Sequence, residues 1–252
     1  MSNNIQPPPT SEPQLDIREQ LFNGGETGPI QQIQVEASLI FSLRGILFDF
    51  DLHMYAPGDL IPDAQSPEEL YQQVVRPWLD HHPVLACMEV RMSGSGLHGI
   101  LRFDKPVELP DEGAQQRWAA CVEVVQAALP IDPGQPGITA TTRAIGSINS
   151  KNGRTVELLT PGKPVTVDEV LSLRDQMKIA PFRTVMENVT GSSRLTPCPV
   201  CRHSDATLSA LDHVGKCYGS SSPCGQVNLA QFYDLLLQPR RPDEEAGQNA
   251  NN

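Results

Sequence analysis

The spacing of four cysteines in the last quarter of the chain constrains its fold more than any other feature. Cys198 and Cys201 enclose two residues, Cys217 follows after fifteen more, and Cys224 after another six. A Cys-x-x-Cys pair is typical of structural zinc sites, and four thiolates complete a closed tetrahedral shell. A segment of about 30 residues cannot bury enough apolar surface to fold alone, so the metal must supply free energy. The sequence therefore predicts a Zn²⁺-binding module that ends near Gly225.

The other potential ligands and thiols are secondary. His203 and His213 are possible substitutes within the zinc site, whereas Cys87 and Cys121 are better interpreted as buried core thiols. The N-terminal sequence MSNNIQPPPTSEPQ lacks the basic start and apolar stretch of a signal peptide, so we expect reduced cysteines and a cytoplasmic protein. Arg44 interrupts the longest apolar stretch, and we expect no membrane partner.

Composition and the order of elements predict the fold class. The 252 residues include 19 Gly and 23 Pro, too many chain breaks for a helical bundle or coiled coil. Hairpins and helices are mixed without a regular βαβ alternation, which predicts an α+β fold with a mixed or antiparallel sheet and flanking helices. We expect strands at 46–53, 87–92, 97–103 and 155–159, and helices at 66–79, 111–129, 166–177 and 227–237.

The same features divide the chain into four parts. Residues 1–14 and 239–252 are polar and rich in Pro or Asn, and we expect disordered tails there. A folded core is predicted at 15–189. A linker (190–197), the zinc-binding module and a helix are predicted within 190–238. The net charge of −11 argues against general nucleic-acid binding, although residues 143–217 carry ten basic and seven acidic residues.

Two acids on one predicted strand are the first candidate for chemistry. Side chains alternate along a strand, so Asp49 and Asp51 share one face while Phe48 and Phe50 share the other. Adjacent carboxylates repel each other, and a divalent cation such as Mg²⁺ or Mn²⁺ removes that repulsion. The alternative is a strand with one solvated face. Because Asp is depleted in strands, we favour the metal interpretation.

A small-residue turn and a basic loop are the next candidates. Ser93, Gly94, Ser95 and Gly96 precede His98 in a turn whose backbone N–H groups can hold an anion, although ordinary hairpin turns look similar. Farther along lies Asp132, in a Pro/Gly-rich loop. The stretch from 143 to 153 then offers groups suited to phosphate or sugar recognition, or to a simple exposed loop: Arg143, Asn149 and Lys151.

Together these stretches resemble the archaeo-eukaryotic primase superfamily, in particular the primases and primase-polymerases of plasmids and phages. The family shows an Asp-x-Asp strand, a small-residue turn leading into a histidine, and a third acid. Asp49, Asp51, His98 and, less directly, Asp132 match that order. An Arg…Gly-Ser…Asn…Lys stretch from Arg143 follows the third acid, as in many plasmid and phage members. The resemblance covers residues 46–160.

The resemblance implies a nucleotidyltransferase that makes short primers on single-stranded DNA. Asp49, Asp51 and Asp132 would hold two Mg²⁺ or Mn²⁺ ions for attack of a 3′-hydroxyl on an α-phosphate. His98 and the turn at 93–96 would bind the nucleoside triphosphate, and the basic stretch from Arg143 would contact phosphates. A replicative helicase is an expected further partner. The cysteine pattern is also similar to the zinc-binding module of DNA primases.

Two other functions remain open at this point. Phe48-Asp49-Phe50-Asp51 also resembles the nucleophile strand of haloacid-dehalogenase-like phosphatases. That family has Thr or Val where this chain has His53, and it has a later acidic pair, whereas the sequence contains no Asp-Asp. A catalytically silent zinc-ribbon adaptor that binds DNA or a replication partner is the other alternative.

Overall fold

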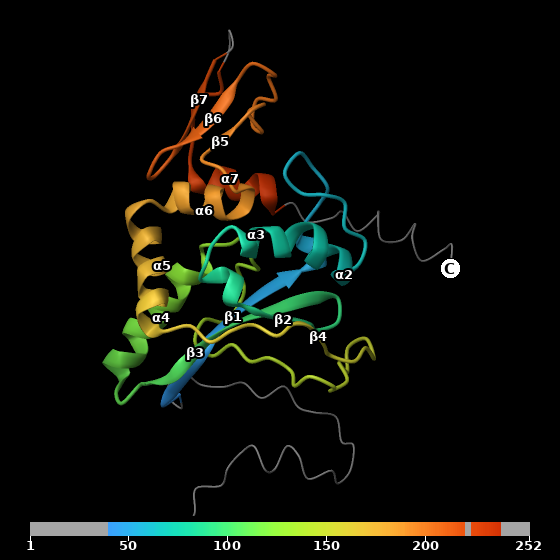
Figure 1. Cartoon of the computed structure of the whole chain (residues 1–252), viewed down its shortest axis with the longest axis vertical. Helices are drawn as coiled ribbons and strands as arrows, with labels where there is room; N and C mark the ends of the chain where they lie inside the picture. Colours follow the sequence, from blue (N-terminus) through green and yellow to red (C-terminus); the bar gives the residue numbers. More distant parts are fainter. Residues whose placement is uncertain (1–39, 220–222, 238–252) are drawn as a thin grey trace, which may run out of the picture. The chain divides into compact units, whose positions relative to one another are not determined.

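Two antiparallel sheets and the helices around them make up the described part of the chain. The computed structural model describes residues 40–219 and 223–237, and the predicted tails lie outside these ranges. The larger sheet has the strand order β1-β3-β2-β4. Its strands are β1 (Ser42–Asp51), β2 (Glu89–Met92), β3 (Gly96–Glu108) and β4 (Glu157–Thr160) (Figure 1). The prediction of an α+β fold with an antiparallel sheet is confirmed.

Alternation of apolar residues along β1 fixes which face of the larger sheet is buried. Ile46, Phe48 and Phe50 are at most 1% exposed, while Asp49 and Asp51 on the opposite face are partly exposed. The predicted strand at 46–53 begins earlier, at Ser42, and ends at Asp51. It stops there because the next residues form the short 3-10 helix η2 (Leu52–Met54).

The predicted helix at 66–79 is present but contains a wider turn. It runs through α2 (Pro67–Leu70), the π-helical segment η3 (Tyr71–Val75) and α3 (Arg76–Asp80). Ser66 caps it by accepting a hydrogen bond from the Glu69 N–H at 3.1 Å. Pro77 has no N–H and its ring would clash with an α-helical carbonyl, so a wider turn before it relieves the crowding.

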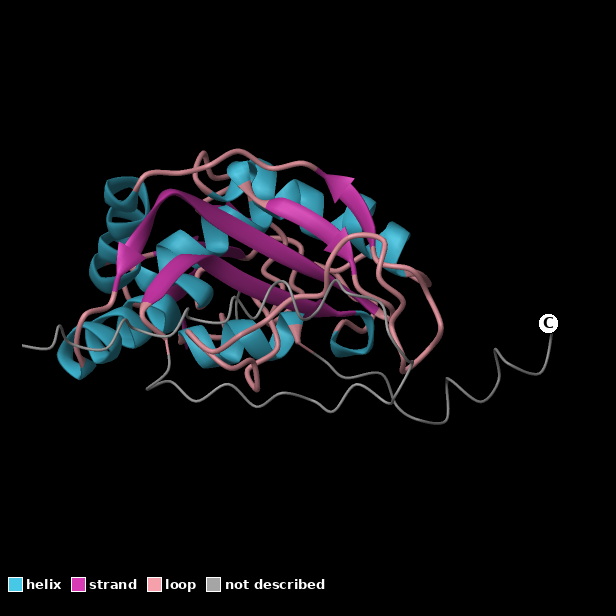
Figure 2. Cartoon of the chain, turned by 90° about the horizontal axis from the view of Figure 1, so that it is seen from below, coloured by secondary structure: helices cyan, strands magenta, loops and turns pink. Residues whose placement is uncertain are grey.

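Local capping signals place the next helices. α4 (Glu112–Gln126) begins where Asp111 accepts from the Ala114 N–H at 2.7 Å. α5 (Val167–Ile179) begins at the Thr166 and Glu169 capping box. Both helices were predicted, at 111–129 and 166–177. They pack against each other, with α4 on β1 and α5 on β3, so they cover one face of the larger sheet. Figure 2 shows helices and long loops flanking its strands.

One helix and the second sheet were not predicted. α6 (Pro181–Thr190) starts with a proline in its first turn and ends at Gly191, whose φ of 69° suits glycine. The second sheet has the order β5-β6-β7-β8. It comprises β5 (Arg194–Leu195), β6 (Thr207–Ala210), β7 (Gly215–Tyr218) and β8 (Gln226–Val227). The stretch predicted as a linker, 190–197, thus contains a paired strand. The predicted C-terminal helix is α7 (Leu229–Leu236), and η4 (Leu85–Cys87) precedes β2.

Phe182 in α6 joins the second sheet to the helices. Its ring is fully buried and lies 5.3 Å, centroid to centroid, from the ring of Phe232 in α7. A Cβ atom added at Gly215 in β7 would come within 2.5 Å of the Phe182 ring, so sheet and helix are in close contact. The Phe182 N–H also donates to the Asp212 carbonyl at 3.0 Å. None of the helices in the described ranges is long and apolar enough to span a membrane.

Replacing Phe182 with alanine should lower the free energy of unfolding by about 3–5 kcal/mol, because it leaves a cavity between α6, α7 and β7. Urea denaturation followed by circular dichroism measures the change. Ile179→Ala is the matched control, since Ile179 is 67% exposed and its truncation should change stability by about 0.5 kcal/mol or less. Equal effects of the two substitutions would show that Phe182 does not hold these elements together.

Candidate active site and zinc site

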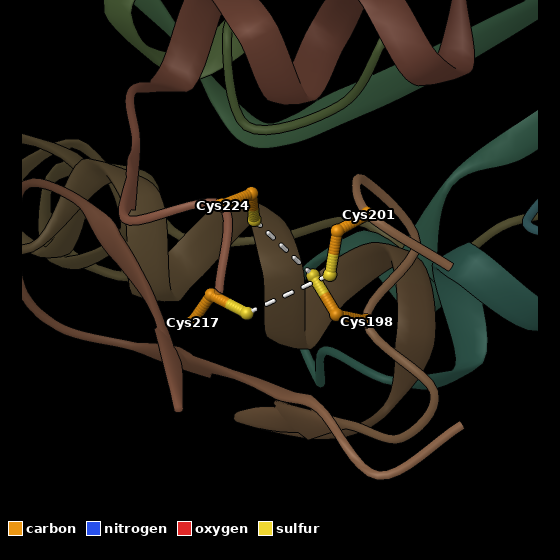
Figure 3. Close-up of side chains that lie close together, drawn as sticks. All are labelled: Cys198, Cys201, Cys217 and Cys224. Carbon is orange, nitrogen blue, oxygen red and sulfur yellow. Dashed lines mark hydrogen bonds between the residues drawn. The ribbon is translucent and has the colours of Figure 1, made fainter. Parts of the chain in front are cut away.

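The four predicted zinc ligands converge. The sulfur atoms of Cys198, Cys201, Cys217 and Cys224 all lie within 4.8 Å of one another, and Figure 3 shows their side chains pointing toward a common centre. Sγ of Cys198 is 3.7 Å from that of Cys224, and Sγ of Cys201 is 3.8 Å from that of Cys217. A tetrahedron with Zn–S bonds of about 2.3 Å has edges of about 3.8 Å. The cysteine cluster therefore has the ligand type, number and spacing that Zn²⁺ requires.

Backbone contacts hold the cysteine cluster in shape. The Arg202 N–H donates to the Cys198 carbonyl at 2.8 Å, and the Cys217 N–H donates to the Gly225 carbonyl at 2.9 Å. A hydrogen bond from the backbone of His203 lowers the pKa of the Cys201 thiol, which favours the thiolate. In the described ranges, only these four cysteines form such a group of potential ligands. The predicted alternatives His203 and His213 are therefore not needed as ligands.

The two remaining cysteines lie outside the cluster. Cys121 in α4 is buried, and burial raises the pKa of its thiol, as expected of a core residue. Cys87 is half-buried, and its sulfur lies 3.4 Å from the Pro83 carbonyl oxygen, to which it donates. Neither thiol belongs to the group of four, and only Cys121 is buried as predicted of a core thiol.

Strand pairing brings the predicted acids and histidine together. Asp49 in β1 lies directly opposite His98 in β3, and the Asp49 Oδ1 atom is 4.0 Å from His98 Nε2. Asp132 reaches the same place from its loop, where its N–H donates to the Asp49 carbonyl at 3.1 Å. Asp51 lies on the same face of β1, two residues on. We call Asp49, Asp51, Asp132 and His98 the acid site.

Asp49 is hard to ionise in its place in the acid site. Burial raises the pKa of Asp49 to about 6, and the negative charges of Asp51 and Asp132 act in the same direction. The positive charge of Lys151 partly opposes them. A carboxylate that is hard to ionise beside two other acids is the electrostatic setting that a divalent cation relieves.

The carboxylate of Asp51 faces the ring of His53. Its Oδ1 atom is buried, and no hydrogen bond of acceptable geometry reaches it from the described residues, although His53 Nδ1 lies 2.6 Å away.

The carboxylates of the acid site do not all lie within 4.8 Å of one another. Oxygens that bind one Mg²⁺ ion are at most about 4.2 Å apart, because each bond is about 2.1 Å long. Two ions about 3.5–4 Å apart span a wider set of acids. The donor type, carboxylate oxygen, is the one that Mg²⁺ or Mn²⁺ prefers, while the side chains as placed do not form a closed ligand set.

His98 is held in the neutral form. It is 9% exposed, and its Nδ1 atom lies within hydrogen-bonding distance, 2.8 Å, of Thr142 Oγ1. Burial lowers the pKa of His98 to about 4, and the positive charges of Arg143 and Arg91 add to the effect. At neutral pH its Nε2 atom faces Asp49 as part of an uncharged ring.

The turn and the basic loop contact each other. In the turn, Gly94 has a φ of 135°, and a Cβ atom there would collide with the Asn149 amide. Asn149 is buried, and its Nδ2 atom donates to the Ser93 carbonyl at 2.5 Å. Its Oδ1 atom accepts from the Lys151 N–H at 3.0 Å. Asn149 therefore positions the turn and loop. Arg143 is held through its carbonyl, which accepts from Arg91 Nη1 at 2.7 Å.

Sequence reasoning missed the residues that position Asp132. Gln135 accepts a hydrogen bond from the Asp49 N–H at 2.6 Å and donates to the Leu47 carbonyl, so its amide binds the free edge of β1. The buried Tyr55 donates to the Pro130 carbonyl at 2.5 Å at the start of the loop. No motif marks either residue, because both contacts join positions at least 75 residues apart.

Comparisons with known proteins give one structural match. No protein-family model matches the chain, and no curated protein matches it significantly. Among solved structures, it is similar to the AEP domain of the primase-polymerase (PrimPol) of cyanophage S-2L. The sequence identity is 17% and the TM-score is 0.36, over 55% of this chain and 63% of that one.

The cysteine cluster should bind one Zn²⁺ per chain, and Cys198→Ser/Cys201→Ser should release it, because two of four thiolate ligands are lost. Elemental analysis of the purified protein measures zinc content. Cys87→Ser, which removes a thiol outside the cluster, should leave the zinc content unchanged. Wild-type protein without zinc, or a double variant with full zinc content, would contradict the assignment.

Proposed function

We propose that this protein is a small DNA primase or primase-polymerase that synthesises short primers on single-stranded DNA by two-metal nucleotidyl transfer. The observation that carries the proposal is the acid site. Asp49 and Asp51 on β1, His98 on β3 and Asp132 on a distant loop meet beside the turn at 93–96. Asp49, with two further acids close enough to raise its pKa, suits cation binding, and the neighbouring cations suit phosphates.

The acid site supplies oxygen ligands for the metal ions. Asp49, Asp51 and Asp132 would hold Mg²⁺ or Mn²⁺. Bound ions would supply charge neutralisation for attack of a primer 3′-hydroxyl on the α-phosphate of a nucleoside triphosphate. The Gln135 side chain and the Asp132 N–H hold the backbone at Asp49 from the open edge of β1. This arrangement fixes the carboxylates before substrate arrives.

The residues next to the acids would bind the incoming nucleotide. Arg143 lies close enough to lower the pKa of His98, and Lys151 close enough to affect that of Asp49. Both side chains would bind phosphate oxygens of the triphosphate or of the template backbone. The neutral His98 ring would hydrogen-bond a phosphate oxygen through Nε2. In this proposal the catalytic core extends to residue 189, and the zinc-binding module at 190–238 contributes to template binding.

Asp49→Asn should abolish nucleotide incorporation, because the amide keeps the shape of the side chain but removes a charged metal ligand. The assay measures labelled nucleotide incorporation on a single-stranded template with Mg²⁺ or Mn²⁺. Asp104→Asn, which removes an exposed acid from the far part of β3, is the control and should retain activity. An Asp49→Asn variant with most of the wild-type activity would refute the metal role. No incorporation by the wild-type protein would instead favour a zinc-ribbon adaptor.

His98→Ala should raise the KM for the incoming nucleotide about tenfold, because it removes one hydrogen bond to a charged phosphate. Steady-state incorporation at varied nucleotide concentration separates KM from kcat. Thr142→Val tests the support of the ring, and we expect a smaller rise in KM from it. Unchanged KM and kcat in His98→Ala would exclude a role for His98 in nucleotide binding.

A further inference from the structure

A second candidate binding site lies between α6 and the second sheet. It is a groove of about 570 Å³, lined by Arg183 from α6 and Arg194 from β5. The hydroxyl side chains of Ser193, Thr207 and Ser209 line it as well. Guanidinium and hydroxyl groups are the donors that bind phosphate oxygens in nucleic-acid complexes. The groove shares no lining residue with the acid site.

Strand register extends this basic surface beyond the groove. Arg194 pairs with Ser209, and Ser209 pairs with Lys216, so the three residues form one row across β5, β6 and β7. Directly paired residues lie on the same face of a sheet. Strands are about 4.8 Å apart, so the backbone positions of Arg194 and Lys216 are about 10 Å apart. Two cations at this spacing can each reach a different phosphate of an extended chain.

An exposed aromatic ring lies beside these cations. Along β7, Lys216 and Tyr218 are exposed while Cys217 between them is buried in the cysteine cluster. The Tyr218 ring is 46% exposed and lines the groove, and Lys216 Nζ lies 5.1 Å from the ring centroid. An exposed ring next to cations is a stacking platform for the bases of a single strand.

Two acidic residues limit the positive charge. Glu187 lines the groove, and Asp212 forms an ion pair with Arg183 at 3.0 Å. With Arg183, Arg194 and Lys216, the local balance is three positive charges against two negative ones. A ligand held by charge alone is therefore disfavoured. A ligand that also stacks a base on the ring and spans the row of cations fits better.

We propose that the groove and the outward face of β5–β7 bind single-stranded nucleic acid. Arg183, Arg194 and Lys216 hold phosphates, and a base stacks on Tyr218. The cysteine cluster on the opposite face of β7 fixes the strands from which these side chains project. The inference deepens the proposed function by locating the template contact of the zinc-binding module, but its test needs no catalysis.

Fluorescence anisotropy with a labelled 20-nucleotide single-stranded DNA tests the proposal. The zinc-loaded full chain is titrated in buffers of increasing salt, without nucleotide or Mg²⁺. Each phosphate contact contributes about −0.7 to the slope of log Kobs against log salt, so Arg194→Ala/Lys216→Ala should make the slope shallower by about 1.4. The control Lys105→Ala/Arg117→Ala removes two exposed cations elsewhere and should change neither affinity nor slope.

The aromatic contact has its own matched pair of variants. Tyr218→Ala should weaken binding at least about fivefold without changing the salt slope, because stacking carries no charge. Tyr218→Phe keeps the ring and should bind like the wild type. Zinc content equal to that of the wild type shows that each variant is folded around its cluster.

Three outcomes would overturn the proposal: equal losses in the two double variants, unchanged binding by Tyr218→Ala, or displacement of the labelled strand by a mononucleotide as effectively as by an unlabelled strand. The last would identify a site for single nucleotides. Strand binding without incorporation would refute only the proposed enzymatic function, and incorporation without binding at the groove would refute only this inference.

Discussion

The antiparallel register between β1 and β3 is the constraint on which the acid site depends. It sets Asp49 opposite His98 and Asp51 opposite Gly96. A shift by one residue would turn every side chain of β1 to the other face, placing the acids in the core and the phenylalanines in solvent. The buried rings of Phe48 and Phe50 make that shift very unfavourable. A Cβ atom at Gly96 would lie 2.5 Å from the Phe50 carbonyl oxygen, so glycine lets the strands pair closely here.

Features set by neighbouring residues could be predicted from the sequence. The caps at Ser66, Asp111 and Thr166 depend on hydrogen bonds to backbone three residues away, and all three are present. The alternation in β1 likewise follows from period two. The cysteine cluster was predictable because a metal site imposes its own spacing on the ligands.

Features that depend on distant contacts could not be predicted in the same way. The strands β5 and β8 have only two residues each, too few for any alternation to be visible. Gln135 lies in a loop whose sequence gives no sign that its amide pairs with β1. The helix α6 had usable signals in Pro181 and Gly191, but its apolar side faces Phe232 and β7, which only the fold brings together.

Cation binding at the crowded carboxylates would also change the stability of the fold. Burial, with the negative charges of Asp51 and Asp132, raises the pKa of Asp49, so the ionised form of Asp49 disfavours the folded chain. By mass action, ions that bind only the folded state add RT ln(1 + [ion]/Kd), about 2.7 kcal/mol at a hundredfold excess over Kd. Under the proposed function, the melting temperature of this fold would therefore report how far the cation sites are filled.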